Sequence, residues 1–368
     1  MRVARTEDTL RLGLINLEHD GGPEPEPGVL PVRWRRTFEE VLAPLRFDWL
    51  GLTELTYSQT RPDAPAKDQA AAQRRWQAAQ QILGMRGFRA AMGQGRNPTG
   101  MLVREPTFTL APAPQRHLNK VFRTPPTVVT LGLREVPGAR IHTAAFHASF
   151  CNPTVREAEA YELTSLVDKV KAHRTDTLPQ ACWLFGDTNE LPLPAGETVP
   201  AIDWTSPAVT DLVHRRHRAL KLPDGTWRTC TFLDEVMLDC GMHDPARYAA
   251  HRLGKTDALA PTSGLADSAV GQGGPRRIDR GVMDGWTIQA VTDVRVIDMS
   301  GLSDHHLLLV DCSRRTLTQT LRRDMPPLTP WELLTTTAST PDRRAAVSVT
   351  RTRGFPSPVT EGSTNCHA

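Results

Sequence analysis

Short apolar stretches, each beside a polar side chain able to bind a metal or a phosphate, recur along the sequence and restrict the fold more than any other feature. The pairs are LGLI with Asn16, DWLGLT with Glu54, TAAF with His147, WLFG with Asp187 and Asn189, and LLLV with Asp304 and His305. In an α/β protein, strand ends on one rim of a sheet meet at a crevice. The sequence therefore predicts an α/β fold with a site assembled from many strand ends.

Periodicity and propensity assign the stretches between these residues to strands and helices. Apolar runs predict strands at residues 10–17, 47–55, 100–105, 127–135, 140–150 and 181–192. Helices are predicted at residues 38–45, 68–83 and 153–173, the last with Thr154 as its cap and Glu157 three residues on. Residues 193–275 show few clear elements, and LLLV is predicted to be a central strand.

The size of the chain and a change in its composition define the predicted domains. With 368 residues, 39% of them hydrophobic, the chain can bury a substantial core. After about Leu317 the periodicity is lost, and the sequence becomes rich in Thr, Ser, Pro and Arg. We therefore predict one folded domain at residues 1–315 and a flexible, low-complexity tail at residues 316–368.

Charge, cysteine usage and hydropathy exclude several classes of protein. The 44 basic and 41 acidic residues nearly balance, so any preference for a polyanion must come from local patches. The six cysteines form no C-x-x-C pair, which favours reduced thiols over a zinc site. The N-terminus lacks a secretory h-region, and no window approaches eighteen consecutive apolar residues. We expect a cytoplasmic protein without a membrane anchor, and the oligomeric state stays open.

Each polar residue has an ordinary explanation when it is taken alone. Asn16 or Glu54 is most simply a turn former or a solvated charge, and His147 a half-buried ring. The GDTN string at residues 186–189 can be an Asx turn, and the Asp of RRID at 276–279 can pair with its Arg neighbours on the surface. What these explanations do not produce is the joint occurrence of all the strings in one order.

That joint pattern resembles the endonuclease/exonuclease/phosphatase superfamily of metal-dependent phosphoesterases. The matching strings are LINLEHDGG, DWLGLTE, GMLVRE, HTAAFHASF, LFGDTNE, TCTF, RRID and LSDHH, in the correct order over residues 10–312. The resemblance implies a four-layered α/β sandwich, in which two mixed β-sheets pack face to face with helices on the outside. It also implies a phosphoesterase site at one edge, and it makes residues 1–315 the catalytic domain.

The resemblance also implies a divalent metal and its ligands. Glu54 resembles the principal metal ligand of the family, and Asn16 and Asp304 match positions close to the metal. Hard carboxylate and amide oxygens suit Mg²⁺ or Mn²⁺, which is the cofactor we expect. Glu18 is either an additional ligand or a solvated loop carboxylate.

Five further residues match the catalytic positions of the family. Asp187 resembles the residue that orients or deprotonates the attacking water, and Asn189 the amide that positions the phosphate. His305 resembles the histidine that contacts the scissile phosphate, with Asp279 as the carboxylate that orients it. His147 matches the strand-end histidine of the deoxyribonuclease-like and phosphatase branches. Alternation along a strand sends neighbouring side chains to opposite faces, so His306 is expected to pack elsewhere.

Three functional classes remain open from the sequence. Local basic clusters at residues 33–36, 74–76, 214–218 and 276–277 favour a nuclease acting on DNA or RNA. The predicted substrate contacts are Arg215, Arg216, Arg277 and Arg280. One alternative is a phosphatase or phosphodiesterase acting on a small phosphorylated metabolite, sugar or lipid headgroup, and a second is a catalytically silent binding scaffold.

Overall fold

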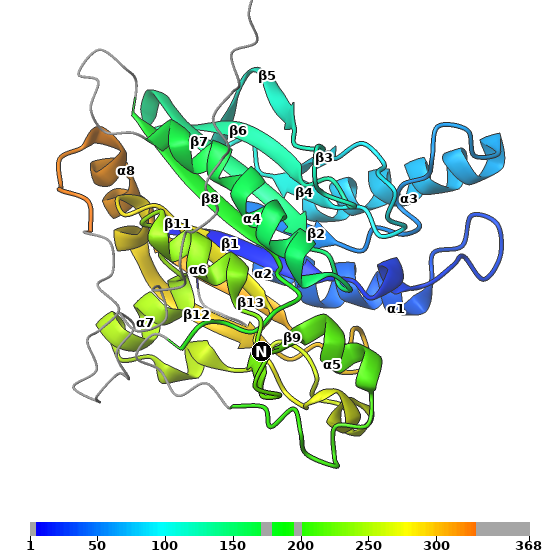
Figure 1. Ribbon diagram of the computed structural model, residues 1–368. Coiled ribbons are helices and arrows are strands. Elements are labelled where there is room, and N and C mark those ends of the chain that lie inside the picture. Colours follow the sequence, from blue (N-terminus) through cyan, green and yellow to red (C-terminus); the bar gives the residue numbers. More distant parts are fainter. Residues whose placement is uncertain (1–4, 171–178, 195–200, 329–368) are drawn as a thin grey trace, which may run out of the picture.

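Two large mixed β-sheets form the centre of the molecule (Figure 1). The computed structural model describes residues 5–170, 179–194 and 201–328. In order across the sheet, the first contains β12 (Val291–Ile297), β13 (Leu307–Ser313), β1 (Thr9–Asn16), β2 (Trp49–Thr53), β4 (Gly100–Val103) and β3 (Arg86–Arg89). The second contains β11 (Asp279–Met283), β8 (Gln180–Asp187), β7 (Val136–His147), β6 (Thr127–Leu133) and β5 (Phe108–His117). As predicted, LLLV belongs to an interior strand, β13.

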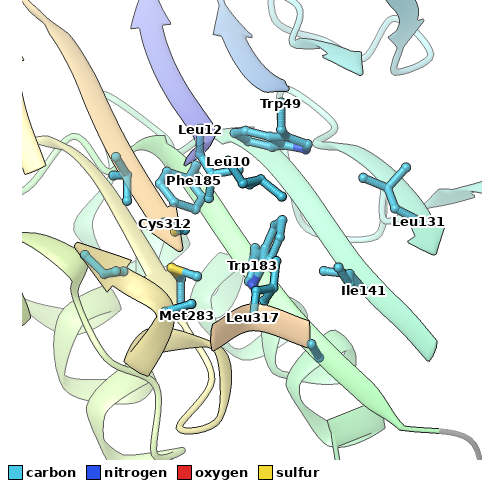
Figure 2. Close-up of a cluster of buried hydrophobic side chains, with 14 of the residues drawn as sticks. Leu10, Leu12, Trp49, Leu131, Ile141, Trp183, Phe185, Met283, Cys312 and Leu317 are labelled. Atoms are coloured by element: carbon cyan, nitrogen blue, oxygen red, sulfur yellow. The ribbon is translucent and has the colours of Figure 1, made fainter. Parts of the chain in front are cut away.

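The largest hydrophobic cluster lies between the two sheets and holds them face to face (Figure 2). Trp49 of the first sheet contacts Phe185 of the second, with ring centroids 5.2 Å apart. Successive strand side chains point to opposite faces. Accordingly, Trp183 and Phe185 enter this cluster, whereas Leu184 between them packs on the outer face of its sheet.

Helices cover the outer face of each sheet. On the first sheet these are α1 (Val32–Arg35), the π-helical segment η2 (Arg36–Leu42), α2 (Ala43–Leu45) and α3 (Ala66–Leu83). Their Trp34, Phe38 and Trp76 side chains pack with strand residues such as Leu50 and Leu52. On the second sheet, α4 (Pro153–Val167) and α6 (Phe232–Asp239) enclose a third cluster. The predicted four-layered α/β sandwich is confirmed.

Each large sheet contains one parallel strand pair, and the other strand pairs within the two sheets are antiparallel. The parallel pairs are β1 with β2 and β7 with β8. The strands β13 and β11 run antiparallel to β1 and β8, so they begin where those strands end. The carboxyl ends of four strands and the amino ends of two more can therefore contribute side chains to the same edge of the sandwich.

The region between residues 201 and 275 contains more regular structure than the sequence indicated. It includes α5 (Leu212–Arg218), the hairpin of β9 (Ala219–Lys221) and β10 (Trp227–Thr229), α6, α7 (Pro245–Leu253) and the 3-10 turns η4 (Thr256–Leu259) and η5 (Asp267–Gln272). These helices are short and are separated by Gly and Pro, so periodicity over a long window does not reveal them.

The N-terminus of α4 differs from its prediction. Asn152, rather than Thr154, is the N-cap, and its side chain accepts hydrogen bonds from the backbone N–H groups of Thr154 and Val155 at 3.1 and 3.2 Å. Pro153 then occupies the first helical position, where its missing N–H costs nothing. The helix ends at Val167 and is followed by a 3-10 turn, η3 (Asp168–Val170). The predicted end at residue 173 lies outside the described residues.

The helix α8 (Arg314–Arg322) shows that the packed part of the chain continues past the predicted boundary at residue 315. Ser313 caps this helix by accepting a hydrogen bond from the N–H of Thr316. Leu317 and Leu321 are fully buried in the cluster between the sheets. Of the predicted tail, residues 329–368 lie outside the described residues.

We expect Leu317→Ala to lower the free energy of unfolding by about 3 kcal/mol, because it leaves a cavity in the main core. Gln319→Ala on the exposed face of α8 is the matched control and should change stability by less than about 0.5 kcal/mol. Urea denaturation of both variants measures the difference. Equal stability of the two variants would show that residues beyond 315 do not belong to the core.

Two further expectations from the sequence concern the cysteines and membrane-spanning helices. The five cysteines in the described part of the chain are free, in agreement with the prediction of reduced thiols. Within the same residues, each helix falls short of the length or apolar character that a bilayer crossing requires.

Candidate active site

Four of the predicted residues lie at the carboxyl ends of the two parallel strand pairs. Asn16 ends β1 and Glu54 directly follows β2, while His147 and Asp187 end β7 and β8 and are paired in register. The Asn16 side-chain amide lies 3.3 Å from Glu54 Oε1 and 3.2 Å from Asp187 Oδ2. These contacts join the ends of both sheets at one edge.

The antiparallel strands bring Asp279 and His305 to the same edge. Asp279 begins β11 opposite Asp187, and its Oδ2 lies 2.7 Å from His305 Nδ1. Ser303 fixes the segment before β13, because its hydroxyl donates to the Asn16 carbonyl at 2.7 Å and accepts from the His305 N–H at 3.1 Å. The site therefore draws on both sheets, although its parts are far apart in the sequence.

Neighbouring carboxylates keep the His305 ring protonated. Burial opposes the charge, but Asp279, Asp187 and Asp304 raise the pKa of His305 to about 10. The ring is nearly buried, and its Nε2 lies 3.4 Å from the Ser263 hydroxyl. At neutral pH the side chain is thus an imidazolium in a fixed orientation.

Asp187 is held in the opposite charge state. Burial favours the neutral carboxyl, but the charges of His147, His305 and Arg218 and the N–H of Asn189 bring the pKa of Asp187 below its usual value. His147 Nε2 is 3.5 Å from Asp187 Oδ2, and the Asn189 N–H donates to Asp187 Oδ1 at 2.8 Å. A buried carboxylate that stays ionised can accept a proton or orient a water molecule.

The oxygen atoms beside this pair can hold a divalent cation. Glu54 adopts a left-handed backbone (φ 62°) directly after β2, which turns its carboxylate toward Asn16. Partial desolvation and the negative charges of Glu18, Glu54 and Asp187 raise the pKa of Asp304, whose side chain is nevertheless 62% exposed. Such crowding of carboxylate oxygens fits Mg²⁺ or Mn²⁺.

Asp187, Asp279 and His305 form another set of potential metal ligands, with one ligand atom of each within 4.8 Å of the others. The imidazole nitrogen nearest the carboxylates, Nδ1, is hydrogen-bonded to Asp279 Oδ2. This bond orients the ring. His305 and Asp279 are therefore described more simply as a hydrogen-bonded histidine–carboxylate pair than as metal ligands. We therefore keep Glu54, with Asn16 and Asp304, as the candidate metal ligands.

The structure places the four arginines predicted to bind substrate in two different environments. Arg277 forms a 2.6 Å ion pair with Asp244, and Arg280 forms a 2.8 Å ion pair with Asp234, all four side chains being buried. Arg280 follows the site residue Asp279 in β11, so alternation turns it to the opposite face. A buried charge of this kind requires its partner. Arg277 and Arg280 therefore belong to structural ion pairs rather than to the predicted set of substrate contacts.

The arginines of α5 are divided between two faces. The guanidinium groups of Arg215 and Arg216 lie over the Trp227 ring, 4.5 and 5.5 Å from its centroid, and Arg215 also donates to the Trp204 carbonyl. Arg218, the last residue of the helix, is 5% exposed and donates to Asn189 Oδ1 at 2.7 Å. Of this cluster, Arg218 therefore contacts a predicted site residue, whereas Arg215 and Arg216 pack on Trp227.

Arg218 links the α5 region to the catalytic edge. Besides Asn189, it donates to the Phe150 carbonyl at 2.8 Å, and Phe150 follows His147 by three residues. In the sequence, Arg218 is only one member of the basic cluster at residues 214–218. Burial and the positive charge of nearby Arg156 lower the pKa of Arg218 to about 9.

We expect Arg218→Gln to lower kcat by about tenfold to a hundredfold, because a supporting contact to the Asn189 amide is lost. Arg216→Gln, on the Trp227 side of the same helix, is the control and should change kcat by less than about twofold. Steady-state kinetics separate kcat from KM, and thermal unfolding checks the fold. Equal effects of the two substitutions would contradict a positioning role for Arg218.

Known structures share this fold. No protein-family model and no curated protein matches the sequence. An endonuclease/exonuclease/phosphatase protein from Bacteroides vulgatus is 12% identical and aligns over 82% of this chain and 98% of its own, with a TM-score of 0.50. The 3'-5' exonuclease NExo from Neisseria meningitidis is 17% identical over 83% of this chain and 100% of its own (TM-score 0.49). Humanized D. rerio TDP2 is 14% identical over 83% and 99% (TM-score 0.48). The chain has the endonuclease/exonuclease/phosphatase fold.

Proposed function

We propose that the protein is a divalent-metal-dependent phosphoesterase that hydrolyses phosphodiester bonds in nucleic acid. The observation that carries this proposal is the meeting of three groups at one edge of the sandwich. These are the Glu54 carboxylate with its amide neighbour Asn16, the ionised Asp187, and the imidazolium of His305 paired with Asp279. Each answers a separate requirement of phosphodiester hydrolysis.

The reaction needs a positioned water and charge neutralisation at the phosphate. Asp187 Oδ2 orients the attacking water and accepts its proton, since this carboxylate remains ionised beside His147 and His305. His305 donates from Nε2 to a nonbridging oxygen, while Asp279 holds Nδ1 and thereby fixes the ring. Such acid and base assistance contributes roughly 10²- to 10⁴-fold to a rate.

The metal requirement rests on Glu54 and its neighbours. Mg²⁺ or Mn²⁺ held by Glu54, with Asn16 and Asp304, would supply Lewis-acid stabilisation of the developing negative charge. The chain itself keeps Glu54 in place through the Asn16 amide and the N–H of His19, which donates to Glu54 Oε2 at 2.9 Å. These residues therefore orient the ligand oxygens before substrate binds.

A groove beside the site supports a polynucleotide as the substrate. It has a volume of about 570 Å³, and Ser149, two residues after His147, is part of its lining. The exposed side chains of Lys120 and Arg123 also line this groove, where they can attract a phosphate backbone. Next to it, the Phe150 ring is 53% exposed, as is suitable for stacking on a base.

A metal-dependent substrate panel tests the proposal. The substrates are plasmid, single-stranded DNA, RNA, bis-p-nitrophenyl phosphate and inositol phosphates, each with Mg²⁺, Mn²⁺ or a chelator. We expect cleavage of polynucleotide that the chelator abolishes. Hydrolysis of monoesters alone would instead favour a phosphatase for small phosphorylated metabolites, sugars or headgroups, and no turnover of any substrate would favour a binding scaffold.

A further inference from the structure

The loop that follows β1 has an unusual backbone. Five consecutive residues, from Glu18 to Gly22, have positive φ, with values of 45°, 56° and 54° at Glu18, His19 and Asp20. A left-handed conformation is unfavourable for a residue other than glycine, because its Cβ crowds the following carbonyl oxygen. Three such residues in succession persist only where surrounding contacts hold them, and strain of this kind concentrates at functional sites.

Strong contacts hold the loop on both sides of His19. On one side, the Glu18 N–H donates to Asn16 Oδ1 at 3.0 Å, and Arg33 binds both the carboxylate and the carbonyl of Glu18. On the other side, the fully buried Asp20 carboxylate accepts from Trp34 Nε1 and from a backbone N–H, each at 3.2 Å. Contacts therefore hold both neighbours of His19, Asp20 in the interior and Glu18 nearer the surface.

His19 itself faces Glu54. Its backbone N–H donates to Glu54 Oε2 at 2.9 Å, and its ring Nδ1 lies 3.2 Å from the same oxygen. The side chain is 63% exposed, so burial does not explain why the ring lies there. The strained loop thus directs one imidazole to the carboxylate proposed as the principal metal ligand.

We infer that His19 contributes a nitrogen ligand to the divalent metal held by Glu54, and so biases the site toward Mn²⁺ over Mg²⁺. This inference rests on the proposed function. Adjacent ligand atoms of a six-coordinate ion bound at 2.0–2.1 Å lie about 3.0 Å apart. The 3.2 Å separation of Nδ1 and Oε2 matches that spacing.

The chemistry of the donor atoms explains the expected selectivity. Mg²⁺ prefers oxygen ligands and retains its water molecules, whereas imidazole nitrogen suits transition-metal ions better. The other ligands that we assign, Glu54, Asn16 and Asp304, offer only oxygen to an ion. His19 is therefore the residue of this site whose removal should distinguish one divalent ion from another.

Metal binding measured without substrate tests this inference. Protein stripped by a chelator is titrated with Mn²⁺ and, separately, with Mg²⁺ in a calorimeter, for the wild type and His19→Ala. We expect the Mn²⁺ dissociation constant to rise by about tenfold and the Mg²⁺ constant to change by less than about twofold. Electron spin-echo spectra of bound Mn²⁺ should also show a directly coordinated imidazole nitrogen that is lost in His19→Ala.

Two controls separate this inference from the proposed function. Glu54→Gln should weaken binding of both ions, and wild-type protein that binds neither ion would overturn the proposed metal site itself. His117→Ala, on the exposed end of β5, should leave both constants unchanged. If His19→Ala weakens Mn²⁺ and Mg²⁺ equally, or neither, His19 only orients Glu54 and the ligand assignment is wrong. His19→Ala keeps the backbone N–H that donates to Glu54, so the loop contact survives.

Discussion

Replacing Asp187 by Asn should lower kcat for phosphodiester hydrolysis by about 10³-fold or more, since the proposed base for the attacking water is lost. Asn has the same shape, and its oxygen can still accept the Asn189 N–H that now binds Asp187 Oδ1. The charge of the carboxylate is what disappears, together with its attraction for His147 and His305. Single-turnover kinetics with saturating metal measure the chemical step directly.

The matched control for this substitution is Asp284→Asn. Asp284 follows the far end of β11, is equally buried and likewise accepts a backbone hydrogen bond, from Cys182 at 2.9 Å. Its replacement should lower the midpoint of thermal unfolding but change kcat by less than about threefold. An Asp187→Asn protein that keeps more than a tenth of the wild-type kcat would show that another group serves the water.

The strand-end residues could be predicted because each follows a local signal. Continuous apolar runs identify the buried strands, and a polar residue at the end of a run is expected at the edge of the core. Asn16, Glu54, His147 and Asp187 all obey this rule, and the structure brings them to one edge. What no local signal contains is the pairing of β1 with β2 and of β7 with β8 as parallel strands, and the resemblance implied only two mixed sheets packed face to face.

The arginines show why substrate contacts were harder to predict. Arg277 and Arg280 look like surface charges in the sequence, but their partners Asp244 and Asp234 lie 33 and 46 residues away. Burial of an arginine depends on such distant partners, and composition does not reveal them. For the same reason the sequence does not reveal the burial of Arg218, whose partner Asn189 lies 29 residues away.

The loop at residues 18–22 was also out of reach of the sequence. A left-handed backbone at Gly21 and Gly22 is expected of glycine, but nothing local favours it at Glu18, His19 or Asp20. Its causes are tertiary contacts such as the ion pair between Arg33 and Glu18. Sequence reasoning could name Glu18 as a possible ligand, whereas the structure pairs Glu18 with Arg33 and turns the neighbouring His19 toward Glu54.

Asp279→Asn should move the alkaline limb of the pH–rate profile to lower pH by at least about 1 pH unit, because His305 loses its main partner. In the wild type, Asp279 together with Asp187 and Asp304 outweighs the effect of burial and raises the pKa of His305 to about 10, so the imidazolium persists through neutral pH. Without the Asp279 charge, burial favours the neutral ring. A shift of about 1 pH unit makes kcat about tenfold lower than in the wild type at pH values above about 10, where both rings lose the proton, while His305→Gln should show no alkaline limb of this origin.

The same pair makes a separate contribution to stability. The pKa of His305 is about 10 in the folded protein, against about 6.5 for an unfolded histidine. The ion pair therefore stabilises the fold fully below about pH 6.5, and this stabilisation is lost as the pH rises from there to about 10. Urea denaturation at several pH values should show that decline in the wild type and a smaller one in Asp279→Asn. A profile that is unchanged by the substitution, in both rate and stability, would mean that Asp279 does not control the charge of His305.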